Sequence, residues 1–292
     1  MKNQNKQRNL KESNSIAEFL GWHLGDGCLS ARKGKLQFSL TGDISEEKTF
    51  YTKEILPAMN KSFKRQLKQP FVLKYYKSVG VCGIYTSNKK FTSYLIRNFN
   101  LNVGKKKDIS VPEYVKTSLQ KKNFLRGLFD TDGSIYFCKS YVRRKTLTPY
   151  NIFHYIPKMK LATISKGLIS DTYKMLLDLG FSPRIQKPIQ QRKNELPIHS
   201  VVLDTKKDIL KWLREVGFRN FKHKTKVEIW EKFGFCPPNT NLETRLKILS
   251  NKINPLVFYK GYSKEQLETF LKQIGFSNDR HLSKLRSRGL VV

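Results

Sequence analysis

The sequence has few acidic residues, few cysteines and no long apolar run. Its 292 residues hold 23 Asp and Glu, and its four cysteines are scattered with no CxxC pair. We therefore expect neither a zinc site nor a disulfide framework, and a reducing intracellular compartment is the default. No run of about 18 apolar residues predicts a membrane span. The polar, basic start also lacks the apolar core of a secretion signal.

Positive charge dominates what is present. The chain carries 56 Lys and Arg, which gives a formal net charge of +33. An excess of this size indicates a polyanionic partner, and nucleic acid fits best because each neutralised phosphate releases condensed counterions. The alternative is a solvated, lysine-rich surface that has no such partner.

Two segments repeat one pattern, an apolar helical run that closes on Asp-Gly. They are residues 19–27 and 125–133, and small residues stand four apart in each run: Gly21, Gly25, Gly127 and Thr131. Small residues at this spacing allow two helices to pack backbone to backbone. We therefore expect the two runs to pair.

Pairing of the two helices would bring Asp26 and Asp132 side by side at their ends. Two adjacent carboxylates repel unless a divalent cation lies between them, and oxygen ligands alone favour Mg²⁺ or Ca²⁺ over zinc. The sequence thus predicts a metal site on a pseudo-twofold axis.

The order of elements after each run is also repeated. Residues 35–41 alternate apolar and polar side chains, which is typical of a half-buried strand. Further strands are predicted at 71–77, 81–86, 134–145, 152–164, 183–192 and 198–203, and helices at 45–60, 88–99, 166–179 and 206–216. An internal duplication accounts for this order.

The duplication divides the chain into four parts. We expect a flexible basic arm over 1–13, a first repeat over 14–120, a second over 121–236 and a C-terminal helical extension over 237–292. Within the extension, a short basic helix near 278–290 resembles the second half of a helix-turn-helix. A helical extension packed on the second repeat is the alternative.

Both runs resemble the LAGLIDADG motif of homing endonucleases. The second is the nearer match, whereas the first departs at Trp22, His23 and Leu24 but keeps the terminal Gly-Asp-Gly. The resemblance implies an α+β fold of two pseudo-symmetric αββαββα repeats. Their antiparallel sheets would be saddle-shaped and their motif helices would pack at the domain interface, with the small helical extension added.

The resemblance also implies the activity. It indicates a monomeric, double-motif endonuclease that uses Mg²⁺ to cut double-stranded DNA at a long asymmetric site, with two or more divalent ions. Mn²⁺ could replace Mg²⁺, and Ca²⁺ could bind without turnover. Such an enzyme is expected to be intron-encoded and to work in the cytoplasm, the nucleoid or an organelle matrix. Two alternatives keep the fold without cleavage: a DNA-binding regulator, and a maturase whose partner is intron RNA.

Site residues follow from the same resemblance. Asp26 and Asp132 are the expected catalytic and metal-binding acids, and the carbonyls of Gly25 and Thr131 are further expected metal ligands, since helix C-termini expose carbonyl oxygens. Lys166 occupies the place of the family's basic residue in the second copy. The matching junction of the first copy, residues 41–43, has no lysine, so unequal cutting of the two strands is expected.

Two further motif residues, Asp130 and His23, are expected to be structural, and one set of surface residues is expected to contact DNA. Asp130 is interpreted as a salt bridge or cap, and His23 as a packed side chain with a satisfied ring nitrogen. The residues expected to contact DNA from the strands and the 143–150 hairpin tip are Lys35, Gln37, Ser39, Lys74, Tyr76, Arg143, Arg144, Lys158, Lys160, Arg184, Gln186, Gln190 and Arg192.

Overall fold

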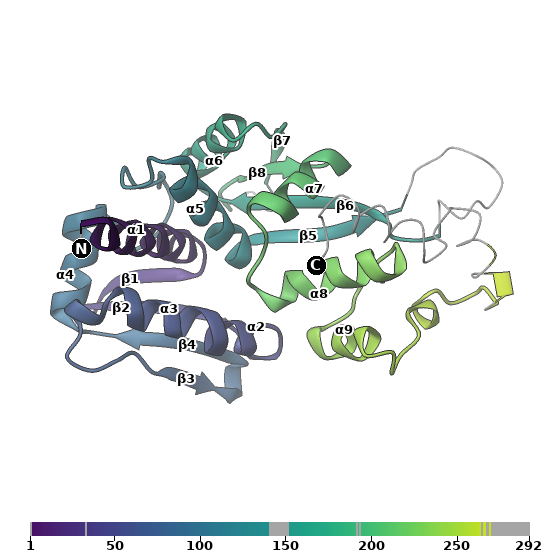
Figure 1. Ribbon diagram of the computed structural model, residues 1–292, viewed down its shortest axis with the longest axis horizontal. Helices are drawn as coiled ribbons and strands as arrows, with labels where there is room; N and C mark the ends of the chain where they lie inside the picture. The colour runs from purple at the N-terminus through teal and green to yellow at the C-terminus, as the bar shows by residue number, and fades with distance from the viewer. Residues whose placement is uncertain are drawn as a thin grey trace.

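Two four-stranded antiparallel sheets with identical topology flank a central pair of helices (Figure 1). The computed structural model describes residues 2–32, 34–139, 152–190, 192, 194–263, 265, 266 and 269. The strand orders are β1-β2-β4-β3 and β5-β6-β8-β7. The expected α+β fold of two repeats is confirmed.

The first repeat follows the expected order. Its elements are α1 (Lys2–Gly25), β1 (Gly27–Arg32), β2 (Lys35–Asp43), α2 (Ile44–Phe50), a π-helical turn (Tyr51–Ile55), α3 (Leu56–Ser62), β3 (Leu73–Tyr76), β4 (Val81–Thr86) and α4 (Lys89–Phe99). Because α1 already begins at Lys2, the segment expected as a flexible arm over 1–13 is helical from residue 2.

The second repeat has the same elements and then two more helices. They are α5 (Ser118–Thr131), β5 (Gly133–Cys138), β6 (Ile156–Thr163), α6 (Lys166–Asp178), β7 (Arg184–Ile189), β8 (Ile198–Leu203), α7 (Lys206–Glu215), α8 (Phe221–Phe233) and α9 (Leu242–Leu249). The sequence predicted neither β1 nor α8 as separate elements.

The hairpin β5-β6 is shorter than predicted. β5 ends at Cys138 and β6 begins at Ile156. Ile152 and Phe153 instead pack in a separate apolar cluster with side chains of the C-terminal segment, among them Tyr259. The predicted hairpin tip over 143–150, with Arg143 and Arg144, lies outside the described residues.

Strand register shows the duplication directly. In the first sheet Gly27 pairs with Leu40, and in the second Gly133 pairs with Leu161. Each glycine follows the motif aspartate, so both motif helices enter their sheets at matching positions.

Local sequence signals explain the burial pattern of β2 and the start of α5. Phe38 and Leu40 on β2 are fully buried while their neighbours are partly exposed, as the predicted alternation requires. Thr117 caps α5 in a capping box with Gln120, since each side chain accepts a backbone N–H of the other residue. These signals are local and therefore readable in the sequence.

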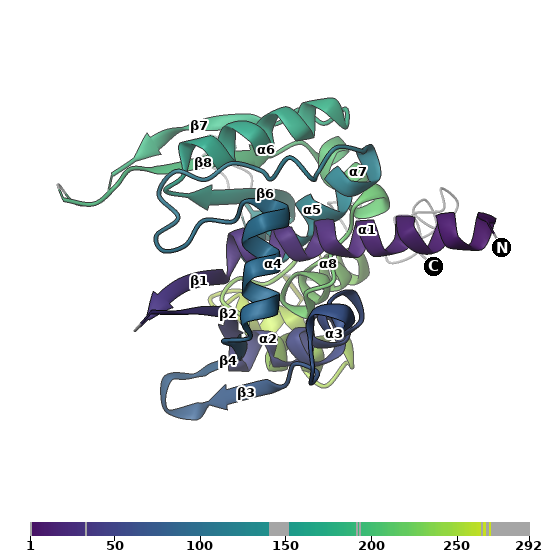
Figure 2. The same ribbon diagram turned by 90° about the vertical axis from the view of Figure 1, so that its left-hand side faces the viewer.

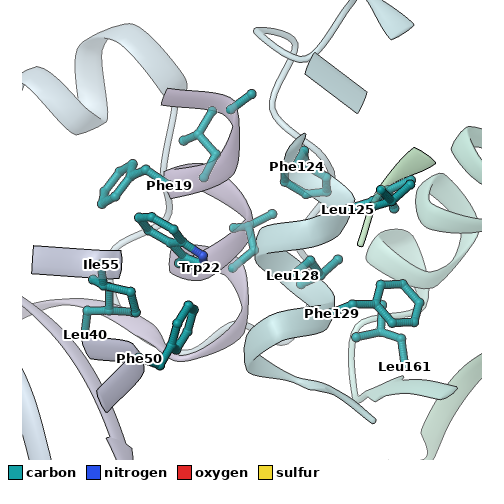
Figure 3. Close-up of a cluster of buried hydrophobic side chains, with 14 of the residues drawn as sticks. Phe19, Trp22, Leu40, Phe50, Ile55, Phe124, Leu125, Leu128, Phe129 and Leu161 are labelled. Carbon is teal, nitrogen blue, oxygen red and sulfur yellow. The ribbon is translucent and has the colours of Figure 1, made fainter. Parts of the chain in front are cut away.

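The core lies on both sides of the contact between α1 and α5. Figure 3 shows Trp22 of α1 pointing toward Phe50 and Phe129 of α5 pointing toward Leu161. Each motif helix thus buries one face against its own sheet and another against its partner helix.

The C-terminal segment joins the second repeat to the first. α9 packs on α8, and its fully buried Arg245 binds Thr225 of α8 and Glu46 of α2. The basic helix expected near 278–290 lies outside the described residues. Over the described part of the chain, no helix has the length and apolar character needed to cross a membrane.

Candidate active site

The seam between α1 and α5 is a backbone contact. A Cβ added to Gly21 would lie 2.2 Å from the Phe124 carbonyl oxygen, and one added to Gly25 would lie 2.0 Å from Thr131 Oγ1. A Cβ at Gly127 would collide with α1 in the same way. The small residues are therefore necessary for the approach, as the sequence predicted, and the C-terminal ends of the two helices meet.

An ion pair supports this seam from the side. Arg126 of α5 donates through Nε and Nη2 to both carboxylate oxygens of Glu18 on α1, at 2.7 and 2.9 Å. Glu18 is 3% exposed. A two-pronged contact of this kind fixes the relative position of the helices more strictly than apolar packing does.

Asp26 and Asp132 stand at the ends of the paired helices. Burial, the charge of Glu47 and the charge of Asp132 raise the pKa of Asp26 from 3.8 to about 8. The pKa of Asp132 is raised mainly by loss of hydration, although its side chain retains access to solvent. Among the described residues, neither carboxylate has a hydrogen bond or an ion pair. The two carboxylates at this end of the seam are therefore candidate ligands for a cation.

Two lysines act on these aspartates, and the sequence assigned neither of them. Lys106 and Lys222 each oppose the rise in pKa of both Asp26 and Asp132. Lys106 lies in the linker after α4, and Lys222 lies in the first turn of α8. The available signal was the echo of Lys105-Lys106-Lys107 in Lys222-His223-Lys224, which marks the same place in the two repeats.

Lys106 closes the end of α1. Its Nζ donates to the carbonyl oxygens of His23 (2.7 Å), Leu24 (3.0 Å) and Gly25 (2.7 Å). A cation at a helix C-terminus satisfies carbonyls that have no partner within the helix. Burial lowers the pKa of Lys106 even though both motif aspartates raise it.

Lys166 lies at the junction of β6 and α6, where the sequence predicted it. It is the first residue of α6, its side chain is exposed, and it is not among the charges that shift the pKa of either motif aspartate. Lys48, in the first repeat, lies 5.4 Å from the centre of the Tyr75 ring. The lysines with an electrostatic effect on the aspartates are thus those of the linker and of α8.

Asp130 has the expected role of a cap. Its carboxylate accepts the backbone N–H groups of Arg219 and Asn220, which precede α8. The Asn220 side chain in turn donates to the Asp130 carbonyl at 2.7 Å. Burial raises the pKa of Asp130 to about 7 against these hydrogen bonds. Asp130 therefore attaches α8 to the end of α5.

His23 is a core residue, with one difference from the expectation. It stacks against Phe19 and Phe38, and burial lowers its pKa to about 3. Its Nδ1 is buried without a hydrogen-bond partner, so the predicted satisfied nitrogen is wrong for this atom. A neutral, enclosed ring cannot serve as a general base for a bound substrate.

The donor set fits a hard divalent cation. Over the described residues there is no group of three or more His, Cys, Asp and Glu side chains that could hold a metal ion. The two aspartates therefore need carbonyl, water or phosphate oxygens to complete a shell, which Mg²⁺ and Ca²⁺ accept. The Gly25 carbonyl, an expected ligand, accepts a hydrogen bond from Lys106 at 2.7 Å.

The expected DNA-contacting residues of the first sheet share its outward face. Register places Ser39 opposite Tyr85 and Lys74 opposite Gly83, on the face away from Leu40 and Ile84. Lys35, Gln37 and Tyr76 have the same parity on their strands, and Tyr76 contacts Tyr85.

The second sheet repeats this arrangement. Lys158, Lys160, Arg184 and Gln186 share one face by register. Three expected residues also have partners within the chain: Arg184 pairs with Asp204, Gln190 donates to the Glu195 carbonyl, and Arg192 lies 3.5 Å from the Glu195 carboxylate. Figure 2 shows that hairpins of both sheets extend to the side of the molecule opposite the N-terminus of α1, where α1 ends.

Part of the chain is similar to proteins of a known family. Residues 119–217 match the family model described as a LAGLIDADG-like domain. The tRNA-splicing ligase RtcB of Methanopyrus kandleri is 24% identical over 224 residues, which cover 73% of this chain and 22% of that protein. The replication factor C small subunit of Methanocaldococcus jannaschii is 26% identical over 204 residues, which cover 70% and 9%. The chain spans less than a quarter of the length of either relative.

Two solved structures have a similar arrangement. A mesophilic variant of the homing endonuclease I-DmoI aligns with a TM-score of 0.47 and 15% identity, covering 70% of this chain and 96% of that one. Full-length DUF199/WhiA from Thermatoga maritima aligns with a TM-score of 0.42 and 16% identity, covering 94% and 90%.

Proposed function

We propose that the chain is a DNA endonuclease that hydrolyses phosphodiester bonds with a divalent cation, and the match of residues 119–217 to a LAGLIDADG-like domain supports this proposal. The observation that carries this proposal is the pair Asp26 and Asp132, two carboxylates without partners at the meeting ends of two helices. A structural role does not require them, since no described residue binds either carboxylate.

DNA is the proposed substrate because of charge and its placement. The net charge of +33 supports strong binding to phosphates. The outward faces of both sheets carry the lysines, arginines and glutamines that the sequence assigned to base and phosphate contacts. The two repeats carry different side chains at these positions, so each would contact a different half of the DNA target. A single chain would therefore recognise a long asymmetric site.

The chemistry assigns separate tasks to the acids and the lysines. Asp26 and Asp132 would hold Mg²⁺, which supplies charge neutralisation at the phosphate and an activated water. Lys222 and Lys106 place ammonium groups beside the same acids, where they would stabilise charge that develops on phosphate oxygens. Lys166 stays a proposed catalytic residue, the basic group of the second repeat that would stabilise charge on the phosphate.

Two observations favour the second candidate, a DNA-binding regulator that does not cut, or an RNA-binding maturase. Lys106 already occupies the carbonyl of Gly25, and the pKa of Asp26 is raised to about 8. Both features weaken metal binding at neutral pH. Cleavage would then require that DNA and the cation together displace the proton from the Asp26 carboxyl group and Lys106 from the Gly25 carbonyl.

A cleavage selection separates the two functions. The protein is incubated with Mg²⁺ and a randomised library of duplex targets, and cut ends are sequenced. The parent should yield one long consensus, and Asp26→Asn and Asp132→Asn should yield none while still binding the selected duplex in Ca²⁺. Asp178→Asn is the matched control, because this exposed carboxylate at the C-terminal end of α6 pairs with Lys121 of α5, and with no other cation among the described residues. Binding without cutting by the parent would support the regulator or the maturase.

A further inference from the structure

Glu47 of α2 is an acid buried at the contact between the two repeats. It is 5% exposed. Its Oε2 accepts the backbone N–H of Asp43 at 3.0 Å, within the first repeat. Its Oε1 accepts Asn220 Nδ2 at 2.9 Å and Lys222 Nζ at 2.8 Å, both from the second repeat. One carboxylate therefore joins the start of α2 to the start of α8.

Lys222 depends on this carboxylate for its position. Its hydrogen bond to Glu47 is the one side-chain partner recorded for its Nζ among the described residues. The side chain is 24% exposed, so water reaches it and other rotamers are open to it. A lysine with four rotatable bonds loses considerable rotamer entropy when held in one place, and a buried acceptor offsets that loss.

The pair lies at the C-terminal end of α5, close to the second motif aspartate. Asn220 Nδ2 donates both to Glu47 Oε1 at 2.9 Å and to the carbonyl oxygen of Asp130 at 2.7 Å, two residues before Asp132. From this place Glu47 and Lys222 both shift the pKa of Asp26 and of Asp132, in opposite directions. The ammonium from the second repeat is thus held near the proposed site by an acid from the first repeat.

We propose that Glu47 is a positioning residue that holds the Lys222 ammonium beside the two motif aspartates. The inference rests on the proposed function, because Lys222 matters for chemistry only where phosphate is bound. It predicts that Glu47 acts through Lys222 and not through the general stability of the interface.

The neighbouring residue provides a matched control. Glu46, on the same helix, also crosses between the repeats, where it accepts the Leu242 N–H at 2.8 Å and binds Arg245. Both of these partners lie on α9, and neither belongs to α8, which carries Lys222. Glu46→Gln therefore weakens a contact between the repeats without releasing Lys222.

The test is a double-mutant cycle on the rate of cleavage. Glu47→Gln, Lys222→Met and the double variant are compared with the parent on the selected duplex, with each DNA strand labelled. We expect Glu47→Gln to slow cleavage of one strand about tenfold in the parent and less than about twofold in the Lys222→Met background. Glu46→Gln should have the same small effect in both backgrounds. Equal losses from Glu47→Gln in both backgrounds would overturn the proposal.

The same four proteins can also be compared by their affinity for DNA, without cleavage. The dissociation constant for the duplex in Ca²⁺ is measured for the four proteins, because the position of Lys222 also affects phosphate binding. If the parent cuts nothing, the proposed nuclease function fails. Coupling of about threefold or more between Glu47 and Lys222 in affinity would still support the positioning role, and independent effects would refute it.

Discussion

Replacing Asp26 by asparagine should stabilise the protein when no metal is present. In the native state the carboxyl group keeps its proton up to about pH 8, whereas the unfolded chain releases it near 3.8. Between these values the native state binds more protons than the unfolded state, so stability falls as pH rises. Asparagine resembles the protonated acid and does not titrate, so it removes this loss.

The size of the effect follows from the shift in pKa. Each pH unit above the unfolded pKa weakens folding by about 1.4 kcal/mol until the native pKa is reached, which gives an upper limit of about 4 kcal/mol at pH 7. Asp26 is only partly buried, and solvent screening and relaxation reduce this limit. We expect a gain of about 1 to 2 kcal/mol at pH 7, or a rise of a few degrees in Tm.

Urea unfolding in EDTA at pH 4, 7 and 8.5 measures this gain. The difference between Asp26→Asn and the parent should be near zero at pH 4 and should grow with pH. Adding Mg²⁺ at pH 8.5 should stabilise the parent more than the variant, because the variant keeps only one of the two proposed carboxylate ligands, Asp132. A variant that is less stable than the parent at every pH would refute the reasoning, since it would show that Asp26 has a partner in the fold.

Four further outcomes are expected. Gly127→Val should lower the free energy of unfolding by about 3 kcal/mol or more, because its Cβ would lie 2.2 Å from the Glu18 carbonyl oxygen; denaturant titration checks this. Asp130→Ala should lose about 2 to 4 kcal/mol by leaving the buried N–H of Asn220 and the partly buried N–H of Arg219 without an acceptor, while Asp130→Asn should lose less in the same titration. Arg245→Met should destabilise by about 3 kcal/mol, since it leaves Glu46 without its buried partner, and proteolysis should then release the C-terminal segment first. DNA affinity should fall about a thousandfold between 50 and 200 mM salt if six or more phosphates are contacted; a flat salt dependence in filter binding would contradict the role given to the net charge.

Most of the helices and strands could be predicted from residue patterns that span a few neighbouring positions. The spacing of Gly21, Gly25 and Gly127 predicted the helix seam, and alternation over 35–41 predicted β2, because helix and strand periods are set by neighbours a few residues apart. The helix over 45–60 was also predicted, although the π-helical turn at Tyr51–Ile55 within it was not. The helix α8 was missed because its residues show no clear apolar stripe, being enclosed by α2, α9 and β5 instead of lying on one surface.

By itself, the sequence determined that two similar halves would pair through small residues and bring Asp26 and Asp132 together, since each aspartate directly follows the small residues of its own motif helix. Only the tertiary structure decided which other charges meet them. Lys106, Lys222 and Glu47 come from a linker and two helices far apart in the chain, and no local period relates them. Their meeting depends on how whole repeats dock, and long side chains at a docked interface are placed by packing over many elements and not by sequence spacing.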